Sequence, residues 1–170
     1  VYTEKWSESV IQKKKKKGSL VDPKNCRGIS LSGISGKLYS SVINHRLQQW
    51  IDMHDIVGEH QAGFKKGYST IDHIFTVFAI IQKQLSQNRK LYVAFIDFEK
   101  AFDSISRKLL WPILQKNGIQ GKLFACVKSM YKNLKTRIRN GASLTDYINC
   151  LRGVKQGDTC SPALFSVFIN

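Results

Sequence analysis

Residues 91–97 read LYVAFID, an unbroken apolar run that ends in a carboxylate. The run 91–96 is the longest apolar run in the chain and is rich in residues that favour β-strands. Side chains alternate between the two faces of a strand, so a run that is apolar on both faces predicts a buried central strand. Asp97 would then lie at the edge of the sheet, where a carboxylate is costly unless a cation or a donor pairs with it.

The flanking sequence predicts helices mixed with hairpins, and therefore the α+β class. Apolar spacing, turn residues and a Ser-Pro pair at Ser161 predict five helices: 35–53, 69–87, 104–117, 121–134 and one that begins at 161. The Asn-Gly pair at 140–141 predicts a hairpin between residues 136–139 and a strand at 144–150. Short apolar pieces beside the lysine run Lys13–Lys17 predict a projecting basic hairpin or loop.

Three of the 12 acidic residues of this basic chain lie within residues 97–103, DFEKAFD. Local acidity in a basic fold indicates a divalent-metal site beside bound phosphates, because Mg²⁺ prefers carboxylates together with substrate phosphates. The alternative is that Asp97 caps a turn and Asp103 caps the following helix. We prefer the capping role for Asp103, whereas for Asp97 both interpretations stay open at this point.

The composition restricts the class of protein and its partners. The 170 residues fit one domain, and 27 Lys and Arg against 12 Asp and Glu give a formal net charge of +15. Such a surplus favours polyanionic partners, nucleic acid first and an anionic membrane second. No apolar run approaches the roughly twenty residues of a membrane span. The four cysteines lack C-x-x-C spacing, so a zinc site is not expected. Because the thiols are scattered along the chain, a reducing compartment is expected.

Four ordered blocks resemble motifs of the reverse transcriptases of non-LTR (LINE-type) retrotransposons. The block VAFIDFEKAFDSI (93–105) resembles their first catalytic motif, and NCRGISL (25–31) resembles their fingers motif. QAGFKKGYST (61–70) is similar to the next block, and GVKQGDTCSP (153–162) resembles the glycine-containing motif before the catalytic hairpin. The blocks cover essentially the whole chain. The resemblance implies a right-hand polymerase, with fingers at residues 1–90 and part of a palm with an antiparallel sheet at residues 91–170.

The same resemblance implies the catalytic centre. Asp97 matches the aspartate that ligates both catalytic Mg²⁺ ions, with Mn²⁺ as a possible substitute, and the backbone carbonyl of Phe98 matches a further ligand. The expected chemistry is two-metal nucleotidyl transfer.

Five further residues match positions that bind the nucleotide. Arg27 matches the residue that clamps the triphosphate, and a lysine of the run 13–17 would assist it. Phe102 matches the aromatic residue under the incoming sugar, whereas Gln156 and Gly157 match residues that touch the nucleotide and the template. Lys65 stands where the family more often has arginine. Each has a plainer alternative: Arg27 as a surface ion-pair partner, Phe102 as a core aromatic, Gly157 as a turn residue and Lys65 as a solvated cation.

The implied partners are an RNA template, a DNA primer, deoxynucleoside triphosphates and the downstream remainder of the chain's own polyprotein, with no membrane. The implied location is intracellular with access to the nucleus. The family's second catalytic motif, an aromatic-Ala-Asp-Asp hairpin, has no match, and the sequence contains no Asp-Asp pair. The 170-residue chain is therefore expected not to polymerise alone and to be poorly soluble. The alternatives are a non-catalytic nucleic-acid-binding module, a decayed element copy and a basic domain without a nucleic-acid role.

Overall fold

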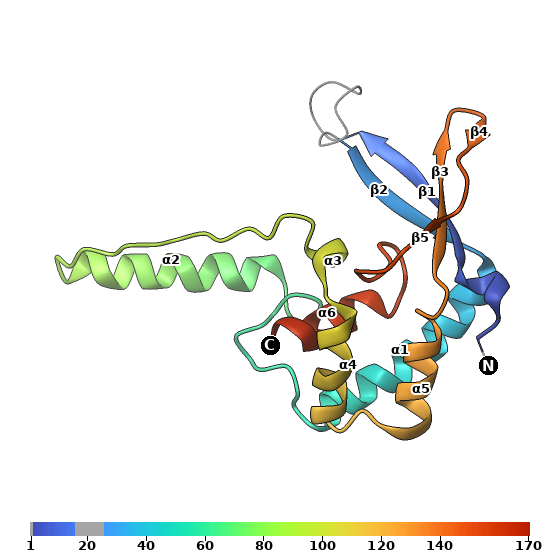
Figure 1. Ribbon diagram of the computed structural model, residues 1–170. Coiled ribbons are helices and arrows are strands. Elements are labelled where there is room, and N and C mark those ends of the chain that lie inside the picture. Colours follow the sequence, from blue (N-terminus) through green and yellow to red (C-terminus); the bar gives the residue numbers. More distant parts are fainter. Residues whose placement is uncertain (1, 16–25) are drawn as a thin grey trace.

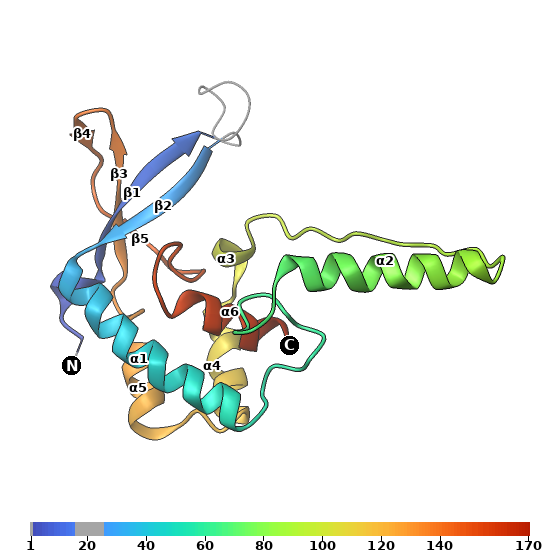
Figure 2. The same ribbon diagram turned by 180° about the vertical axis from the view of Figure 1, so that it is seen from behind.

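A computed structural model of the chain describes residues 2–15 and 26–170 (Figure 1). A twisted sheet lies at one end of the molecule, a group of helices lies at the other, and a single long helix projects to one side (Figures 1 and 2). In chain order the elements are η1 (Glu4–Ser7), β1 (Glu8–Lys15), β2 (Cys26–Ser32), α1 (Ile34–Met53), α2 (Thr70–Ser86), α3 (Ala101–Ser104), α4 (Arg107–Lys116), α5 (Gly121–Ser129), β3 (Lys135–Asn140), β4 (Ser143–Leu144), β5 (Ile148–Asn149) and α6 (Ser161–Ile169).

The sheet joins strands from both ends of the described chain. Its order is β2-β1-β3-β4, and β5 also pairs with β3. Strands β1 and β2 pair antiparallel, as the two arms of the predicted basic hairpin would, and residues 16–25 between them lie outside the described part of the chain. Strand β3 instead runs parallel to β1, from the pair Glu8↔Lys135 to the pair Gln12↔Arg139. The prediction of an antiparallel sheet is therefore wrong for the pair β1 and β3, and the sheet is mixed. A parallel pair needs a long crossover connection, which the helices between β2 and β3 provide.

The hydrophobic core lies between α1, α4, α5 and α6, away from the sheet. Leu47, Leu110, Leu114, Val127 and Leu164 are completely buried there. These residues come from the apolar stripes of amphipathic helices, which must bury one face against a neighbour. The predicted helices at 35–53, 69–87 and from 161 are confirmed within one or two residues.

Two predicted helices are shorter than expected. Residues 101–104 form the separate helix α3, and α4 begins only at Arg107, after Ser106. Helix α5 ends at Ser129, and residues 130–133 continue as hydrogen-bonded turns. In the described part of the chain, no helix combines the length and the apolarity needed to cross a membrane.

The buried strand predicted at residues 91–96 is wrong. The segment has no strand assignment, and the exposed fractions are 87% for Tyr92, 87% for Phe95 and 84% for Ile96. A strand forms only beside a partner that takes up its backbone hydrogen bonds, and no described strand lies beside this segment. The sequence pattern indicates a preference for burial, but the described residues contain no partner strand beside this segment.

Helix α2, like the segment that follows it, exposes its apolar side chains. It buries none of its residues, and Ile71, Ile74, Phe75, Phe78 and Leu85 are exposed along it. The helix and the following segment run back along one another as an arm that projects from the helical group (Figures 1 and 2). Large exposed apolar surfaces of this kind are typical of interaction sites or aggregation-prone faces.

Candidate functional site

A tight turn at residues 100–105 is the centre of the candidate site. Lys100 adopts a left-handed conformation with φ 51°, and its carbonyl accepts hydrogen bonds from the backbone N–H groups of Asp103 and Ser104. The turn is fixed to the loop before α6 by two further backbone bonds of 2.9 Å. Gly153 N–H donates to the carbonyl of Ile105, and Val154 N–H donates to the carbonyl of Phe102.

Gly153 is required where the loop meets the turn. Its φ is +78°, a region in which side chains other than hydrogen are disfavoured. A Cβ atom there would lie 2.9 Å from both the Cα atom and the carbonyl oxygen of Asp103. Because these are backbone atoms, they cannot move aside without displacing the turn. The glycine therefore permits the close contact between two of the blocks identified in the sequence.

Gln156 connects three segments that are distant in the sequence. Its Nε2 atom donates to Oδ2 of Asp103 at 3.1 Å, and its backbone carbonyl accepts from Ser30 N–H of β2 at 3.0 Å. Gly157 follows with φ +97°, and a Cβ atom there would approach the carbonyl oxygen of Ser30 to 3.1 Å. The structure therefore brings Gln156 and Gly157 together with β2 and with the turn at residues 100–105.

Asp103 does not cap the next helix, so that prediction is wrong. Asp103 lies within α3, whereas Ser106 is the residue that precedes α4. The carboxylate of Asp103 accepts the bond from Gln156. The sequence offered no signal for this bond, because the two residues lie 53 positions apart.

Phe102 belongs to an aromatic cluster drawn from two of the blocks and from α6. Its ring stacks on Phe165 of α6 with a centroid distance of 5.1 Å and an interplanar angle of 23°. Phe64 packs edge-on against both rings, at 5.9 Å from Phe102 and 6.4 Å from Phe165. Phe64 itself has φ +62°, so the backbone of its loop is held in an uncommon conformation. Phe102 is only half-buried in this cluster.

The ammonium group of Lys65 is bound within its own loop region. Its Nζ donates to the carbonyl of Val57 at 3.1 Å and lies 5.3 Å from the ring centroid of Tyr68. Arg27 lies on β2, where its backbone pairs with Lys14 of β1. The side chain of Arg27 and residues 16–17 of the lysine run lie outside the described residues.

Asp97 and Phe98 lie on the extended segment and are exposed. A carboxylate and a backbone carbonyl supply too few oxygens for Mg²⁺, which demands near-octahedral coordination. Among the residues that the structure describes, no three His, Cys, Asp or Glu side chains gather closely enough to hold a metal ion. The described residues therefore do not by themselves form the magnesium site that the sequence motif implies.

Two charged side chains beside Gln156, those of Lys155 and Asp158, are buried. Lys155 donates to the hydroxyl of Tyr2 at 3.3 Å, and burial lowers the pKa of its ammonium group. Burial also raises the pKa of Tyr2 to about 12, with a further contribution from the buried Asp158. Desolvation is the larger cause for both groups, as expected for polar side chains removed from water. Lys155 is therefore held inside the fold by its bond to Tyr2, whereas Oδ2 of the buried Asp158 has no hydrogen-bond partner among the described residues.

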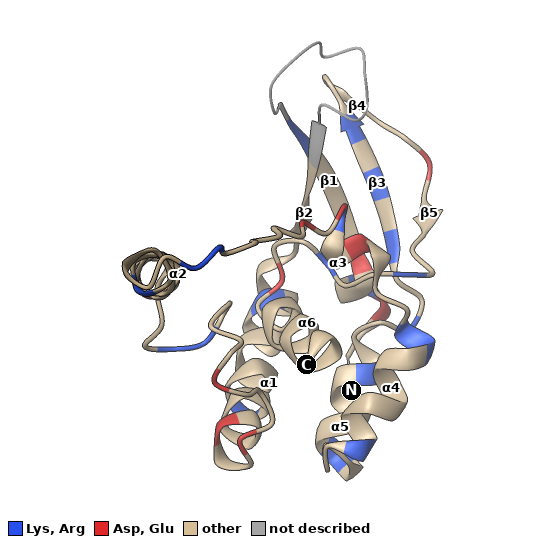
Figure 3. Ribbon diagram, turned by 90° about the vertical axis from the view of Figure 1, so that its left-hand side faces the viewer, with Lys and Arg blue, Asp and Glu red and all other residues tan. Residues whose placement is uncertain are grey.

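Positive charge is spread over both the sheet and the group of helices (Figure 3). Lys and Arg follow β1 and β3 and the helices α4 and α5, whereas acidic residues are scattered (Figure 3). Because phosphate groups are attracted to such surfaces, the distribution fits a nucleic-acid partner.

Comparison with known proteins gives consistent matches. The family model described as "Reverse transcriptase (RNA-dependent DNA polymerase)" matches residues 11–170. The Pol polyprotein from the type-1 retrotransposable element R2 of Popillia japonica is 31% identical over 160 residues, which is 91% of this chain and 21% of that protein. The RNA-directed DNA polymerase from the mobile element jockey of Drosophila melanogaster is 25% identical over 163 residues, 95% of this chain and 18% of that protein. The chain thus spans about a fifth of these relatives.

Proposed function

This chain belongs to the reverse transcriptase (RNA-dependent DNA polymerase) family, and from that premise we propose that it is a segment of an RNA-directed DNA polymerase of the non-LTR retrotransposon type. The proposed segment binds the incoming nucleotide and the template strand. The observation that carries the proposal is the double attachment of Gln156, whose side chain bonds to Asp103 and whose backbone bonds to Ser30 of β2. Three of the four sequence blocks that resemble the family's motifs are therefore in direct contact.

The nucleotide would lie against the turn at residues 100–105. We assign Phe102 to the sugar, because its ring is held in place by Phe165 and is still partly exposed. Gln156 and Gly157 would contact the base pair from the adjacent loop. Arg27 would reach the triphosphate from β2, because a guanidinium group can meet two phosphate oxygens at once.

Lys65 was expected to bind the nucleotide, and this role stays a prediction. Its bond to the carbonyl of Val57 favours a positioning role, in which Lys65 holds the loop that packs Phe64 against Phe102.

Asp97 is proposed as one ligand of the divalent-cation site, with the carbonyl of Phe98 beside it. The family expectation is two Mg²⁺ ions, with Mn²⁺ as a substitute. Because the described residues lack the other ligands, the proposal requires carboxylates from elsewhere in the polyprotein. Under the same proposal, residues 1–90 belong to the fingers and residues 91–170 to the palm of a right-hand polymerase. The template is RNA, the primer is DNA, and the enzyme has access to the nucleus, where such elements integrate.

The decisive experiment compares Asp97→Asn with Glu99→Gln in a polypeptide that also carries the downstream part of its polyprotein. Both residues are exposed and both substitutions remove one negative charge. Primer extension on an RNA template should fall at least about 100-fold for Asp97→Asn, because a metal ligand contributes several kcal/mol to the transition state. Glu99→Gln should stay within a few-fold of wild type. Equal extension by the two variants would remove Asp97 from the mechanism.

A second candidate function is a non-catalytic nucleic-acid-binding module, such as a decayed element copy. The observation in its favour is that the described residues contain no complete set of metal ligands, although the positive charge is retained. Under this alternative, Asp97→Asn leaves RNA binding unchanged, and no variant of the polypeptide, including the wild type, extends a primer.

A further inference from the structure

A wide cavity lies between α4, α5, the start of β3 and the loop after β5. Its volume is about 1150 Å³, which exceeds the roughly 300–1,000 Å³ of sites that enclose one small ligand. Its lining contains none of the residues assigned to the polymerase site. The proposed function therefore leaves this cavity without a role.

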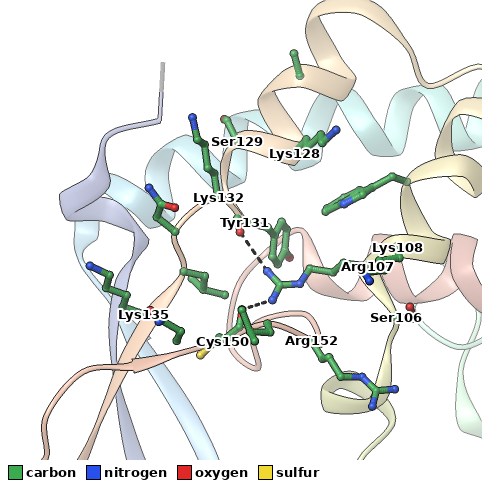
Figure 4. A pocket seen from close by; sticks show the side chains of 16 residues that line it. Ser106, Arg107, Lys108, Lys128, Ser129, Tyr131, Lys132, Lys135, Cys150 and Arg152 are labelled. Atoms are coloured by element: carbon green, nitrogen blue, oxygen red, sulfur yellow. Dashed lines mark hydrogen bonds between the residues drawn. The ribbon is translucent and has the colours of Figure 1, made fainter.

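The cavity wall carries six cationic side chains and no acidic one. They come from separate elements and surround the cavity in Figure 4: Arg107, Lys108, Lys128, Lys132, Lys135 and Arg152. All except Arg107 are exposed. In the described part of the chain, none of these five donates a hydrogen bond to a protein acceptor, although Lys128 lies over the ring of Phe124 at 5.7 Å. The charges repel one another, so a bound anion would lower the free energy of the folded state.

Arg107 has a different role and explains how the cavity is built. Its guanidinium group is buried and donates to the backbone carbonyls of Tyr131 and Cys150, as the dashed lines in Figure 4 show. These two bonds tie α4 to the segments that carry Lys132 and Arg152. Arg107 therefore joins α4 to two of the other segments that line the cavity.

An aromatic ring completes the cavity. Trp111 lies in the wall, half-buried, with its ring 5.8 Å from Tyr131 and 6.3 Å from Phe124. Aromatic rings among cationic side chains are typical of sites for single-stranded nucleic acid, because bases stack on the ring while phosphates contact the cations.

A row of cations extends from the cavity along the sheet. Lys135, Arg137 and Arg139 alternate with Thr136 and Ile138 on β3, so the three cations lie on one face. Arg139 pairs with Gln12 of β1, which places Lys14, two residues further along β1, on that same face. Strands β1 and β3 carry bands of Lys and Arg in Figure 3, and Glu8 of β1 lies beside Lys135 on the same face.

We propose that this cavity is a second binding site for a single strand of nucleic acid, separate from the candidate polymerase site. The strand is held through its phosphates by the five exposed cations and stacks a base on Trp111. It leaves the cavity along the basic face of β3. The proposal rests on the proposed function only in taking nucleic acid as the partner, and it requires neither a metal ion nor nucleotide transfer.

The test measures binding of fluorescent fifteen-nucleotide oligo(U) and oligo(dT) to the full chain over a range of salt concentrations. The pocket variant combines Lys128→Gln, Lys132→Gln and Lys135→Gln. Loss of three phosphate contacts should weaken binding about 10- to 100-fold at 0.1 M salt and reduce the salt slope by about 2, at roughly 0.7 per contact on a single strand. Weaker binding of both oligonucleotides would indicate that the site recognises the phosphates, which RNA and DNA share. Weaker binding of oligo(U) alone would indicate a site for RNA.

The matched control combines Lys83→Gln, Lys90→Gln and Lys116→Gln, which are equally exposed and lie outside the cavity. The control should weaken binding less than about threefold, because it removes only long-range attraction. Equal losses in the two triple variants would overturn the proposal.

A measurement on the unmodified protein covers the case in which a variant fails to fold. Saturating oligo(U) should protect Lys128, Lys132 and Lys135 from a lysine-acylating reagent and leave Lys83 and Lys116 reactive. Absence of this protection would also overturn the proposal. Because neither test involves primer extension, failure here leaves the polymerase proposal standing, and failure of the Asp97→Asn experiment leaves this site standing.

Discussion

The side-chain amide of Gln156 donates a hydrogen bond to the carboxylate of Asp103 at 3.1 Å, across 53 residues of sequence. The bond joins the turn that follows the extended segment to the loop that precedes α6. Both residues lie near the surface, so the bond is expected to contribute about 1 kcal/mol. Its importance lies in orientation, because it fixes the residue proposed to contact the nucleotide.

Removal of this acceptor should weaken nucleotide binding. In the longer polypeptide, Asp103→Ala should raise the KM for deoxynucleoside triphosphates about fivefold, which corresponds to the loss of one such bond. Asp103→Asn keeps an oxygen that accepts from Gln156 and should change KM less than about twofold. Steady-state primer extension measures both. Equal effects of the two substitutions would assign the role of Asp103 to its charge.

A methyl group at Gly153 should destabilise the chain. Gly153→Ala combines a disfavoured φ of +78° with contacts of 2.9 Å to the backbone of Asp103, so we expect a loss of about 2–4 kcal/mol in the free energy of unfolding. Gly141→Ala is the control, because its φ of +61° is similar but nothing lies within 4 Å. It should cost about 1 kcal/mol in urea unfolding. Similar losses would show that the contact at Gly153 relaxes freely.

The buried guanidinium group of Arg107 should be essential for stability. Arg107→Met leaves the carbonyls of Tyr131 and Cys150 without their donor, which we expect to cost about 2–4 kcal/mol in urea unfolding. Lys108→Met, at the exposed neighbouring position, should cost less than about 0.5 kcal/mol. A wild-type unfolding midpoint for Arg107→Met would show that other donors replace the guanidinium.

The projecting arm should cause the isolated chain to self-associate. Ile74→Lys with Phe78→Lys interrupts the exposed stripe of α2 and should shift sedimentation toward the monomer, because burial of that surface drives association. Thr76→Lys with Gln87→Lys adds the same charge to exposed positions outside the stripe and should have a smaller effect. A wild-type chain that sediments as a single monomeric species at micromolar concentration would contradict this expectation.

Local sequence signals predicted the elements that depend on local physics. Helical spacing located α1 and α2, the Ser-Pro pair located α6, and Asn140-Gly141 located the β3–β4 turn. The single strand predicted at 144–150 is wrong, because β4 ends at Leu144 and β5 covers only Ile148–Asn149. Features that depend on partners distant in the sequence could not be predicted from local signals. Nothing local indicates that Glu8 pairs in parallel with Lys135, or that Asp103 accepts from Gln156 instead of capping a helix. The apolar run 91–96 predicted a buried strand, but a strand cannot form without a neighbouring strand to take up its backbone hydrogen bonds.

The exposed segment at residues 89–98 also determines where the chain can be divided. Proteases bind their substrates in extended conformation, and this exposed stretch offers Arg89, Lys90, Tyr92 and Phe95 to enzymes of different specificity. A nick here would separate β1, β2, α1 and α2 from the remaining elements. The parallel pairing of β1 with β3 and the packing of α1 on α5 and α6 cross the nick, so the two pieces would remain together as one non-covalent heterodimer.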